Sequence, residues 1–235
     1  IVQISHVSKR FVIRKEKSLK ERIVNAGRSA KFKEDFWALR NINFEIDSGS
    51  TIGLIGANGS GKSTLLKLLN GLVMPSSGEV IVDGMNTARD LARVRKHVGY
   101  IFTDPLAQLV ISTPLDDVQL SLRSTIKNRA ARRARGRELL EARGLGMVAE
   151  QSIYDLSGGE RQLVSLTTVL AVEPGVIVAD EPTGNLDAKA TAHLLDLFDD
   201  LRATRHVALV IATHDPVVAA RLPRCLRLSA GRMES

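Results

Sequence analysis

The sequence is poor in cysteine and has no hydrophobic run long enough to cross a membrane. Cys225 is the single cysteine among 235 residues, so no disulfide can form within the chain, and a lone thiol fits a reducing compartment. A membrane-spanning helix needs about 18 or more consecutive apolar residues, and no apolar run reaches that length. No secretory signal pattern opens the sequence. We therefore expect a cytoplasmic globular protein, and neither a disulfide-rich secreted domain nor a membrane-spanning one.

The chain also lacks a uniformly basic character, although its formal charge is +7. Residues 1–40 carry a net charge of +7, and the run 127–137 (KNRAARRARGR) carries six basic and no acidic side chains, which leaves the rest at −6. This distribution argues against a protein that binds nucleic acid over its whole surface. Two interpretations of the basic run stay open, namely contact with anionic lipid headgroups and a solvated helix face.

Strand and helix patterns alternate along most of the chain, which predicts a parallel sheet with helices on both faces. Residues 14–35 form an insertion between the first two expected strands. Within it, Leu19, Ile23 and Val24 lie at helical spacing and predict a short surface helix. Strands are expected at 1–11, 37–46, 51–55, 79–84, 97–102, 176–180, 207–213 and 225–228. Helices are expected at 62–70, 88–95, 159–172, 187–203 and 215–221.

A glycine-rich loop follows the strand at 51–55, precedes the helix at 62–70, and matches the pattern GxxxxGK[ST]. Glycines let backbone N–H groups wrap a phosphate without Cβ clashes, and a helix N-terminus adds favourable partial charge for an anion. In this pattern the lysine reaches the β- and γ-phosphates, and the final hydroxyl binds Mg²⁺. The expected nucleotide-binding residues are Gly56, Ala57, Asn58, Gly59, Ser60, Gly61, Lys62, Ser63 and Thr64.

The apolar strand at 176–180 ends in two carboxylates, Asp180 and Glu181. On its own this pattern is weak, because a carboxylate often begins a helix, here before Pro182. After a phosphate-binding loop, Asp180 is expected to bind Mg²⁺ through water or together with Ser63. Glu181 is then placed to act as the general base toward the attacking water.

A second glycine-bearing segment, LSGGE, contains Ser157, Gly158, Gly159 and Glu160. It has the spacing of a capping box at the start of the helix at 159–172, and alone we would interpret it as that. With the two preceding motifs present in this order, we predict a second anion-binding site instead.

Together, the glycine-rich loop, the two carboxylates and LSGGE resemble the ATP-binding subunit of an ABC transporter, and the resemblance covers essentially the whole chain. It implies an α/β fold with a P-loop NTPase (RecA-like) core and parallel sheet, an N-terminal antiparallel β subdomain and an inserted α-helical subdomain. It implies hydrolysis of ATP with Mg²⁺ in a head-to-tail dimer of two ATP-binding subunits, where Lys62 of one chain and Ser157 of the other enclose each ATP. The implied partner is a transmembrane permease subunit and not nucleic acid, so that the chain lies peripheral to the inner face of the cell membrane.

The resemblance also implies a division of the chain and roles for further residues. Residues 1–235 form a single domain, whose β lobe and first core part span about 1–102, whose helical lobe spans about 103–157, and whose core resumes over 158–235. Asp187, in the sequence Asn-Leu-Asp, matches a loop that lines the dimer interface. His214 matches the histidine that contacts the γ-phosphate. Phe11 matches the aromatic that stacks on adenine, Trp37 is a competitor, and core packing is the alternative for both.

One position departs from the family pattern. The family usually carries a glutamine after the strand YIF, where it touches Mg²⁺ and relays the nucleotide state to the membrane subunit. This chain carries Thr103 there. Threonine keeps an oxygen for the metal but is shorter, so the coupling contact is in question. Gln108 lies five residues on, too far to substitute directly.

Different stretches resemble different transporter subfamilies. Residues 5–70 look like exporters of lipid-linked polysaccharide or teichoic acid, 70–182 like energy-coupling-factor importers of biotin or cobalt, and 183–235 like lipoprotein-release or macrolide-export ATPases. Natural divergence, recombination and an engineered chimera all remain open. We expect micronutrient uptake first, with biotin as the solute, and export as the alternative. A non-transport ABC ATPase and an inactive nucleotide-binding module are the alternatives from other classes.

Overall fold

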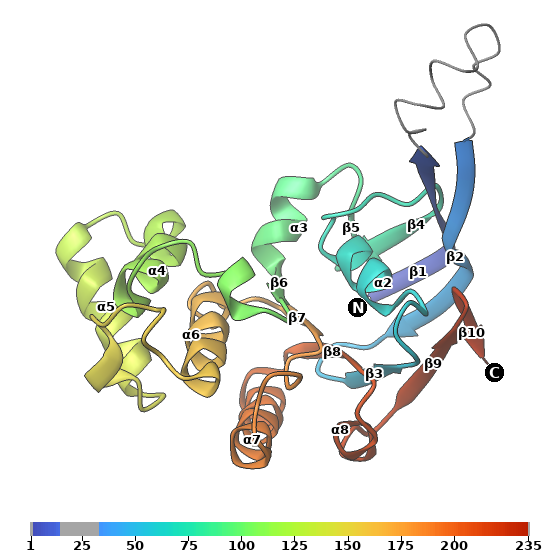
Figure 1. The fold of residues 1–235 in the computed structure, drawn as a ribbon. Coiled ribbons are helices and arrows are strands. Elements are labelled where there is room, and N and C mark those ends of the chain that lie inside the picture. Colours follow the sequence, from blue (N-terminus) through green and yellow to red (C-terminus); the bar gives the residue numbers. More distant parts are fainter. Residues whose placement is uncertain (1, 15–32, 235) are drawn as a thin grey trace, which may run out of the picture.

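A six-stranded, largely parallel sheet lies at the centre of the molecule, which we describe from a computed structural model over residues 2–14 and 33–234 (Figure 1). Its strands lie in the order β10-β9-β3-β8-β7-β6, and all neighbours pair in parallel except β10 and β9. Their bounds are β3 (Thr51–Ile55), β6 (Val98–Ile101), β7 (Val176–Asp180), β8 (Ala208–Thr213), β9 (Cys225–Ser229) and β10 (Arg232–Glu234). The predicted parallel sheet is confirmed, with β10 as an added antiparallel edge strand.

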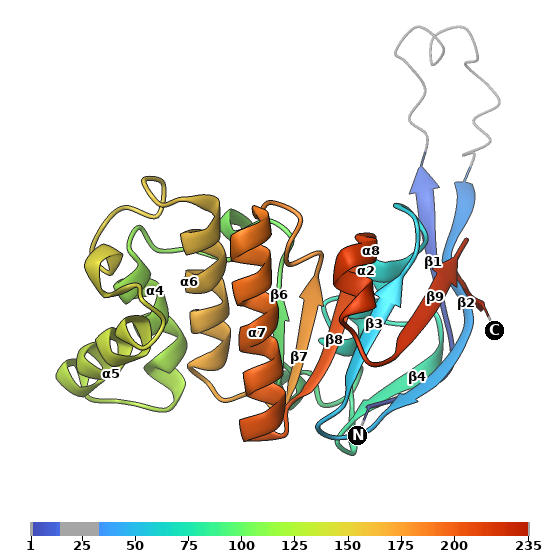
Figure 2. The ribbon, with the colours of Figure 1, turned by 90° about the horizontal axis from the view of Figure 1, so that it is seen from below.

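Helices cover both faces of this sheet (Figures 1 and 2). In β7, Val176 and Val178 pack into the core shared with α2 and α3, whereas Ile177 and Ala179 pack into the core shared with α6, α7 and α8. Strands buried on both faces carry continuous apolar runs rather than alternation, which explains VIVA. The helices are α2 (Lys62–Leu69), α3 (Leu91–His97), α6 (Gly158–Leu170), α7 (Ala188–Arg205) and α8 (Pro216–Ala220).

An antiparallel sheet of four strands, in the order β2-β1-β4-β5, forms a second layer whose inward residues share the apolar core of α2 and β7. It comprises β1 (Val2–Arg14), β2 (Lys33–Ile46), β4 (Ser77–Val82) and β5 (Met85–Asn86). The first two strands extend further than predicted, as a long ribbon that projects from the molecule (Figure 2). The helix expected within 14–35, with Leu19, Ile23 and Val24, lies outside the described residues.

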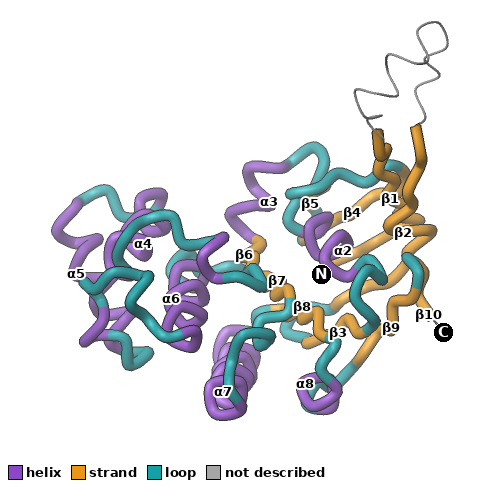
Figure 3. Tube along the Cα trace, viewed as in Figure 1, coloured by secondary structure: helices purple, strands orange, loops and turns teal. Residues whose placement is uncertain are grey.

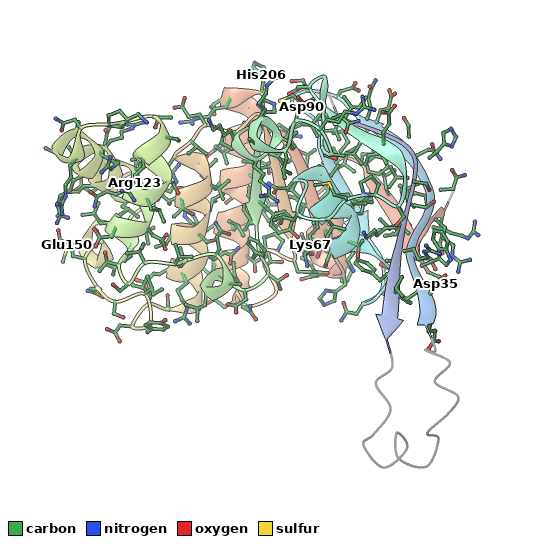
Figure 4. The ribbon with its side chains drawn as sticks, turned by 90° about the horizontal axis from the view of Figure 1, so that it is seen from above. Asp35, Lys67, Asp90, Arg123, Glu150 and His206 are labelled. Carbon is green, nitrogen blue, oxygen red and sulfur yellow. The ribbon has the colours of Figure 1, made fainter. Side chains whose placement is uncertain are left out.

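Residues 103–157, all of which the structure describes, contain helices and no strand (Figure 3). Their elements are η1 (Pro105–Ala107), α4 (Pro114–Ser121), η2 (Leu122–Ser124), α5 (Arg129–Glu141) and η3 (Gly146–Val148). This lobe has its own apolar core, in which Leu115, Leu140 and Ile153 pack with Val164 of α6. Figure 4 shows that the lobe, marked by Glu150, lies at the opposite end of the molecule from the antiparallel sheet.

Among the residues described, none of the helices has the length and apolar character needed to cross a membrane.

The separate core of the helical lobe leads to a stability prediction. Leu140 is fully buried there, whereas Leu120 of α4 is 37% exposed. We expect Leu140→Ala to lower the free energy of unfolding by about 2–5 kcal/mol, because it removes apolar contacts and leaves a cavity. Leu120→Ala is the matched control, with an expected change within about 0.5 kcal/mol. Urea unfolding followed by circular dichroism measures both, and equal losses would contradict a packed lobe core.

Candidate active site

The functional segments meet at the carboxyl ends of three neighbouring strands. β3, β8 and β7 pair in parallel, with Ile55 opposite Thr213 and Asp180 opposite Ala212. The glycine-rich loop follows β3, the two carboxylates end and follow β7, and His214 follows β8. Parallel strands bring their carboxyl ends to one edge of the sheet, where ligands of α/β proteins bind.

The backbone conformation at Gly61 shapes the glycine-rich loop, and the Lys62 side chain holds the loop in place. Gly61 has φ 109°, and a Cβ there would lie 2.6 Å from the carbonyl oxygen of Ala38, so a side chain does not fit. Lys62, 5% exposed, donates from Nζ to the carbonyl oxygens of Gly56 (2.7 Å) and Ala57 (3.3 Å). No side chain caps the N-terminus of α2. Its first-turn N–H groups therefore suit an anion.

Asp180 is a buried carboxylate with partners from two elements. Its Oδ1 accepts a hydrogen bond from Ser63 Oγ (2.9 Å) and its Oδ2 accepts one from Tyr100 OH (3.1 Å). Burial and the neighbouring charge of Asp180 raise the pKa of Tyr100 far above its usual range, so the phenol stays a donor. Hydroxyl and carboxylate oxygens are the hard donors that Mg²⁺ prefers. Ser63 and Asp180 thus fit the metal.

Thr103 lies beside this pair, with its hydroxyl directed at the main chain. Its Oγ1 donates to the carbonyl oxygen of Asp180 at 2.8 Å. A hydroxyl that donates once still has acceptor capacity, so a metal role for Thr103 stays a prediction. Gln108 lies elsewhere, because its amide donates to Ser165 and Thr168 of α6.

The other two side chains predicted to be catalytic, Lys62 and His214, lie next to Glu181. Its Oε1 lies 3.4 Å from Lys62 Nζ, and its Oε2 lies 2.9 Å from His214 Nδ1 and 3.2 Å from the His214 amide nitrogen. The backbone of Glu181 is left-handed (φ 48°), which is rare for a residue with a side chain and is found at functional sites. Buried Oε1 accepts no hydrogen bond among the described atoms. This oxygen therefore has capacity for a water molecule.

The LSGGE segment forms the N-terminus of α6 as a complete capping box. Ser157 Oγ accepts from the Glu160 amide (3.2 Å), and Glu160 Oε2 accepts from the Ser157 amide (2.8 Å) and hydroxyl (2.7 Å). The hydrogen bonds from Ser157 lower the pKa of Glu160. The capping box, which was the alternative interpretation of this motif, is therefore present in the fold. Binding of an anion by LSGGE stays a prediction.

The same segment contacts the loop before α7. A Cβ on Gly158 would lie 3.2 Å from the Asn185 carbonyl oxygen, and one on Gly159 would lie 3.4 Å from Ala190 Cβ. Asp187 caps α7, because its Oδ1 accepts from the Ala190 amide at 2.7 Å. Both α6 and α7 pack on the face of the sheet opposite to α2. One chain therefore joins LSGGE to the Asp187 loop but not to the glycine-rich loop.

Both candidate adenine-stacking aromatics are half-exposed on the long β1–β2 ribbon, and neither is buried in a core. Phe11 is 38% exposed, with Lys9 Nζ 4.9 Å from its ring centre. Trp37 is 37% exposed, with the guanidinium carbons of Arg10 and Arg40 at 5.8 Å and 6.0 Å from its ring centre. Stacking of adenine on Phe11 stays a prediction.

A cavity of about 380 Å³ lies between the glycine-rich loop and the β9–β10 hairpin. Its walls are residues 56–60 of the loop, residues 227–230 and Glu234. Arg227 and Glu234 lie 3.7 Å apart there. The loop is thus flanked by open space as well as by the sheet.

The chain is similar to ATP-binding proteins of transporters. The family model described as ABC transporter matches residues 39–184. The lipoprotein-releasing system ATP-binding protein LolD of Chromohalobacter salexigens is 37% identical over 207 residues, which cover 85% of this chain and 86% of that protein. LolD of Bordetella pertussis is 38% identical over 201 residues, covering 83% and 87%.

Solved structures share the whole fold. The ATP-binding cassette MJ0796, solved as a dimer in a post-hydrolysis state with ADP and Pi, has a TM-score of 0.84 at 29% identity, covering 100% of this chain and 97% of that one. CbiO1 of Clostridium perfringens, part of the ABC transporter complex CbiONQ, has a TM-score of 0.79 at 25% identity, covering 100% and 87%. The predicted α/β fold with its antiparallel subdomain is confirmed.

Tyr100 is a site residue that the sequence analysis missed, because it lies within an apolar strand pattern. We expect Tyr100→Phe to lower the free energy of unfolding by about 1.5–3 kcal/mol, since Asp180 loses a donor while the ring keeps its packing against Phe102. Tyr154→Phe, at a 71% exposed tyrosine, is the control and should leave stability unchanged. Thermal and urea unfolding measure both variants. Equal stability of Tyr100→Phe and the parent chain would contradict the assignment.

Proposed function

The chain belongs to the ATP-binding subunits of ABC transporters, and from that premise we propose that two copies close head-to-tail around two ATP molecules to power a membrane partner. The observation that carries this proposal is the position of Ser157 at the start of α6, on the face of the sheet opposite to α2 and Lys62. A second chain, turned the other way, supplies the missing half of each site.

Within each site, the residues of this chain bind and orient ATP. Lys62 and the first-turn amides of α2 bind the β- and γ-phosphates. Ser63 and Asp180 would hold Mg²⁺, which when bound neutralises charge on the phosphate oxygens. Glu181 accepts a proton from the water that attacks the γ-phosphorus, and the bond to the ADP oxygen breaks. His214 holds the Glu181 carboxylate in place through Oε2.

Further roles follow from the same proposal. Phe11 stacks on adenine, Thr103 contributes an oxygen on the metal side, and Asp187 lines the dimer interface. The segment of Ser157, Gly158, Gly159 and Glu160 binds the γ-phosphate of the ATP held by the other chain. Its position at a helix N-terminus supports this role.

For the transported substrate, we infer a lipoprotein-release type of transporter. Support comes from LolD relatives that are 37% and 38% identical over more than four fifths of the chain. Micronutrient uptake, our first expectation, is the second candidate, and it rests on the resemblance of residues 70–182. In both cases the chain would lie at the inner face of the membrane, held there by its permease.

Substitution of Glu181 tests hydrolysis of ATP separately from binding of ATP. We expect Glu181→Gln to bind ATP, to accumulate as a dimer with ATP and to lose phosphate release by about 10²–10⁴-fold, because the amide accepts no proton. Lys62→Ala should instead lose ATP affinity, because the amine no longer reaches the phosphates. Phosphate-release assays, calorimetry and sedimentation measure these three properties.

The two variants also serve as controls for each other. Rapid phosphate release by Glu181→Gln would move the general base to another residue. Unchanged ATP affinity of Lys62→Ala would remove the lysine from the phosphate site. A Glu181→Gln chain that binds ATP yet stays monomeric would contradict the head-to-tail dimer while leaving the ATPase assignment intact.

The membrane partner can be identified by co-expression. We expect the chain to co-purify with a lipoprotein-release type permease in detergent and to hydrolyse ATP faster in that complex than alone. A micronutrient permease with its small substrate-binding subunit is the parallel test. Association with the second permease alone would favour uptake, and association with ribosomes or DNA instead of either would contradict a transport role.

A further inference from the structure

Helix α5 carries a row of arginines at the outer edge of the helical lobe (Figures 1 and 2). Arg129, Arg133 and Arg137 follow one another at intervals of four residues, so their side chains leave the same side of the helix. We call these three residues the basic stripe. All three are exposed, whereas Leu139 and Leu140 of the same helix are buried in the core of the lobe. The stripe therefore faces solvent.

A single carboxylate is shared by two members of the basic stripe. Glu150 Oε1 accepts hydrogen bonds from Arg133 (2.6 Å) and from Arg137. Among the described residues, Arg129 has no carboxylate within ion-pair distance. Three arginine charges and one glutamate charge leave the stripe and Glu150 together with a net charge of +2. Glu150 lies at the end of the molecule opposite to the antiparallel sheet (Figure 4).

The position of the basic stripe along α5 adds to the cost of this charge. Arg129 is the first residue of the helix, and the first turn, which the structure describes in full, has no acidic residue. The N-terminus of a helix carries a positive partial charge, so cations are unfavourable there. A bound anion would offset this repulsion and the mutual repulsion of the three guanidinium groups.

The neighbours of the basic stripe indicate the kind of anion. The exposed positions of α5 are occupied by arginine, alanine and glutamate alone. They offer no aromatic ring on which a base could stack and no large apolar anchor for a protein partner. Guanidinium groups bind phosphate oxygens through paired N–H donors. The stripe therefore fits a surface that presents phosphates, without insertion into an apolar phase.

We propose that the basic stripe binds the phosphate headgroups of an anionic lipid bilayer directly, beside the permease. The inference rests on the proposed function, which places the chain next to a membrane. Binding along a polynucleotide is disfavoured by the charge of −6 that the chain carries outside residues 1–40 and 127–137. Glu150 is then an internal competitor for the stripe, because exposed ion pairs are weak and exchange for a phosphate.

Two variants change binding in opposite directions. Arg133→Gln with Arg137→Gln should lower partition onto anionic vesicles about 10–30-fold, because each basic side chain near such a surface contributes about fivefold. Glu150→Gln removes the competitor and should raise partition about fivefold. Arg93→Gln with Lys96→Gln, at two exposed residues of α3, is the matched control for net charge and should bind nearly as the parent chain does.

Co-sedimentation of the full chain with vesicles measures partition, without nucleotide or permease. The vesicles are phosphatidylcholine alone and phosphatidylcholine mixed with phosphatidylglycerol, at about 0.1 M and about 0.5 M NaCl. We expect binding to the mixed vesicles at the lower salt concentration only, because salt screens exposed charges. Residues 1–40 also carry +7 but are unchanged in every variant, so a difference from the parent chain reports on α5. Circular dichroism checks that each variant keeps its helices.

The outcomes separate this inference from its alternatives. Equal partition of the parent chain and the double arginine variant would overturn it, as would unchanged or weaker partition of Glu150→Gln. Equal binding to both kinds of vesicle would indicate apolar insertion and would overturn it too. Tighter binding to a DNA duplex than to the mixed vesicles, at the same salt concentration, would assign the stripe to nucleic acid instead.

ATP hydrolysis on the same samples distinguishes failure of this inference from failure of the proposed function. We expect kcat and KM for ATP to stay within about twofold of the parent chain in all variants, because α5 lies outside the nucleotide site. Absence of ATP hydrolysis in the parent chain would contradict the proposed function, whatever the vesicles show. Normal hydrolysis with equal partition of all variants would contradict the role of the basic stripe alone.

Discussion

The buried carboxylate of Asp180 is the interaction on which the rest of the site depends. An ionised carboxylate that is 5% exposed is costly unless hydrogen bonds compensate for lost hydration. Here the donors come from Ser63 of α2 and Tyr100 of β6, and the carbonyl of the same residue accepts from Thr103. The hydrogen bonds of Asp180 thereby join the phosphate-binding helix α2, the adjacent strands β6 and β7, and the loop that leads to the helical lobe.

The sheet around Asp180 leaves one edge for chemistry. Because helices bury both faces, polar groups gather where the strands end, and Glu181 follows Asp180 at that edge. Its amide donates to the Ala212 carbonyl oxygen, which fixes a left-handed backbone that turns the side chain between Lys62 and His214. The strained conformation is stabilised by the neighbouring strand, by the opposite charge of Lys62 and by the contact with His214.

The sequence is informative where covalent spacing alone determines the geometry. β7 was predicted with its exact bounds, because five buried residues between loops leave no other choice, and the loop ending at Lys62 is a contiguous motif. The short strands β5 and β10 and the full length of β1 were missed, since pairing partners and not local patterns define them.

Links between distant residues were missed for the same reason. Tyr100 lies 80 positions from Asp180, and Gln108 lies 57 positions from Ser165. Periodicity places Tyr100 in a strand, but the order β6-β7-β8-β3 decides which carboxylate it meets.

The capping box at the start of α6 is a local feature that the spacing of Ser157 and Glu160 does predict. The Ser157 hydroxyl that would bind a phosphate already donates to the Glu160 carboxylate. In the proposed dimer, phosphate from the other chain must therefore compete with Glu160 for this hydroxyl, and closure is disfavoured until ATP supplies the compensating contacts.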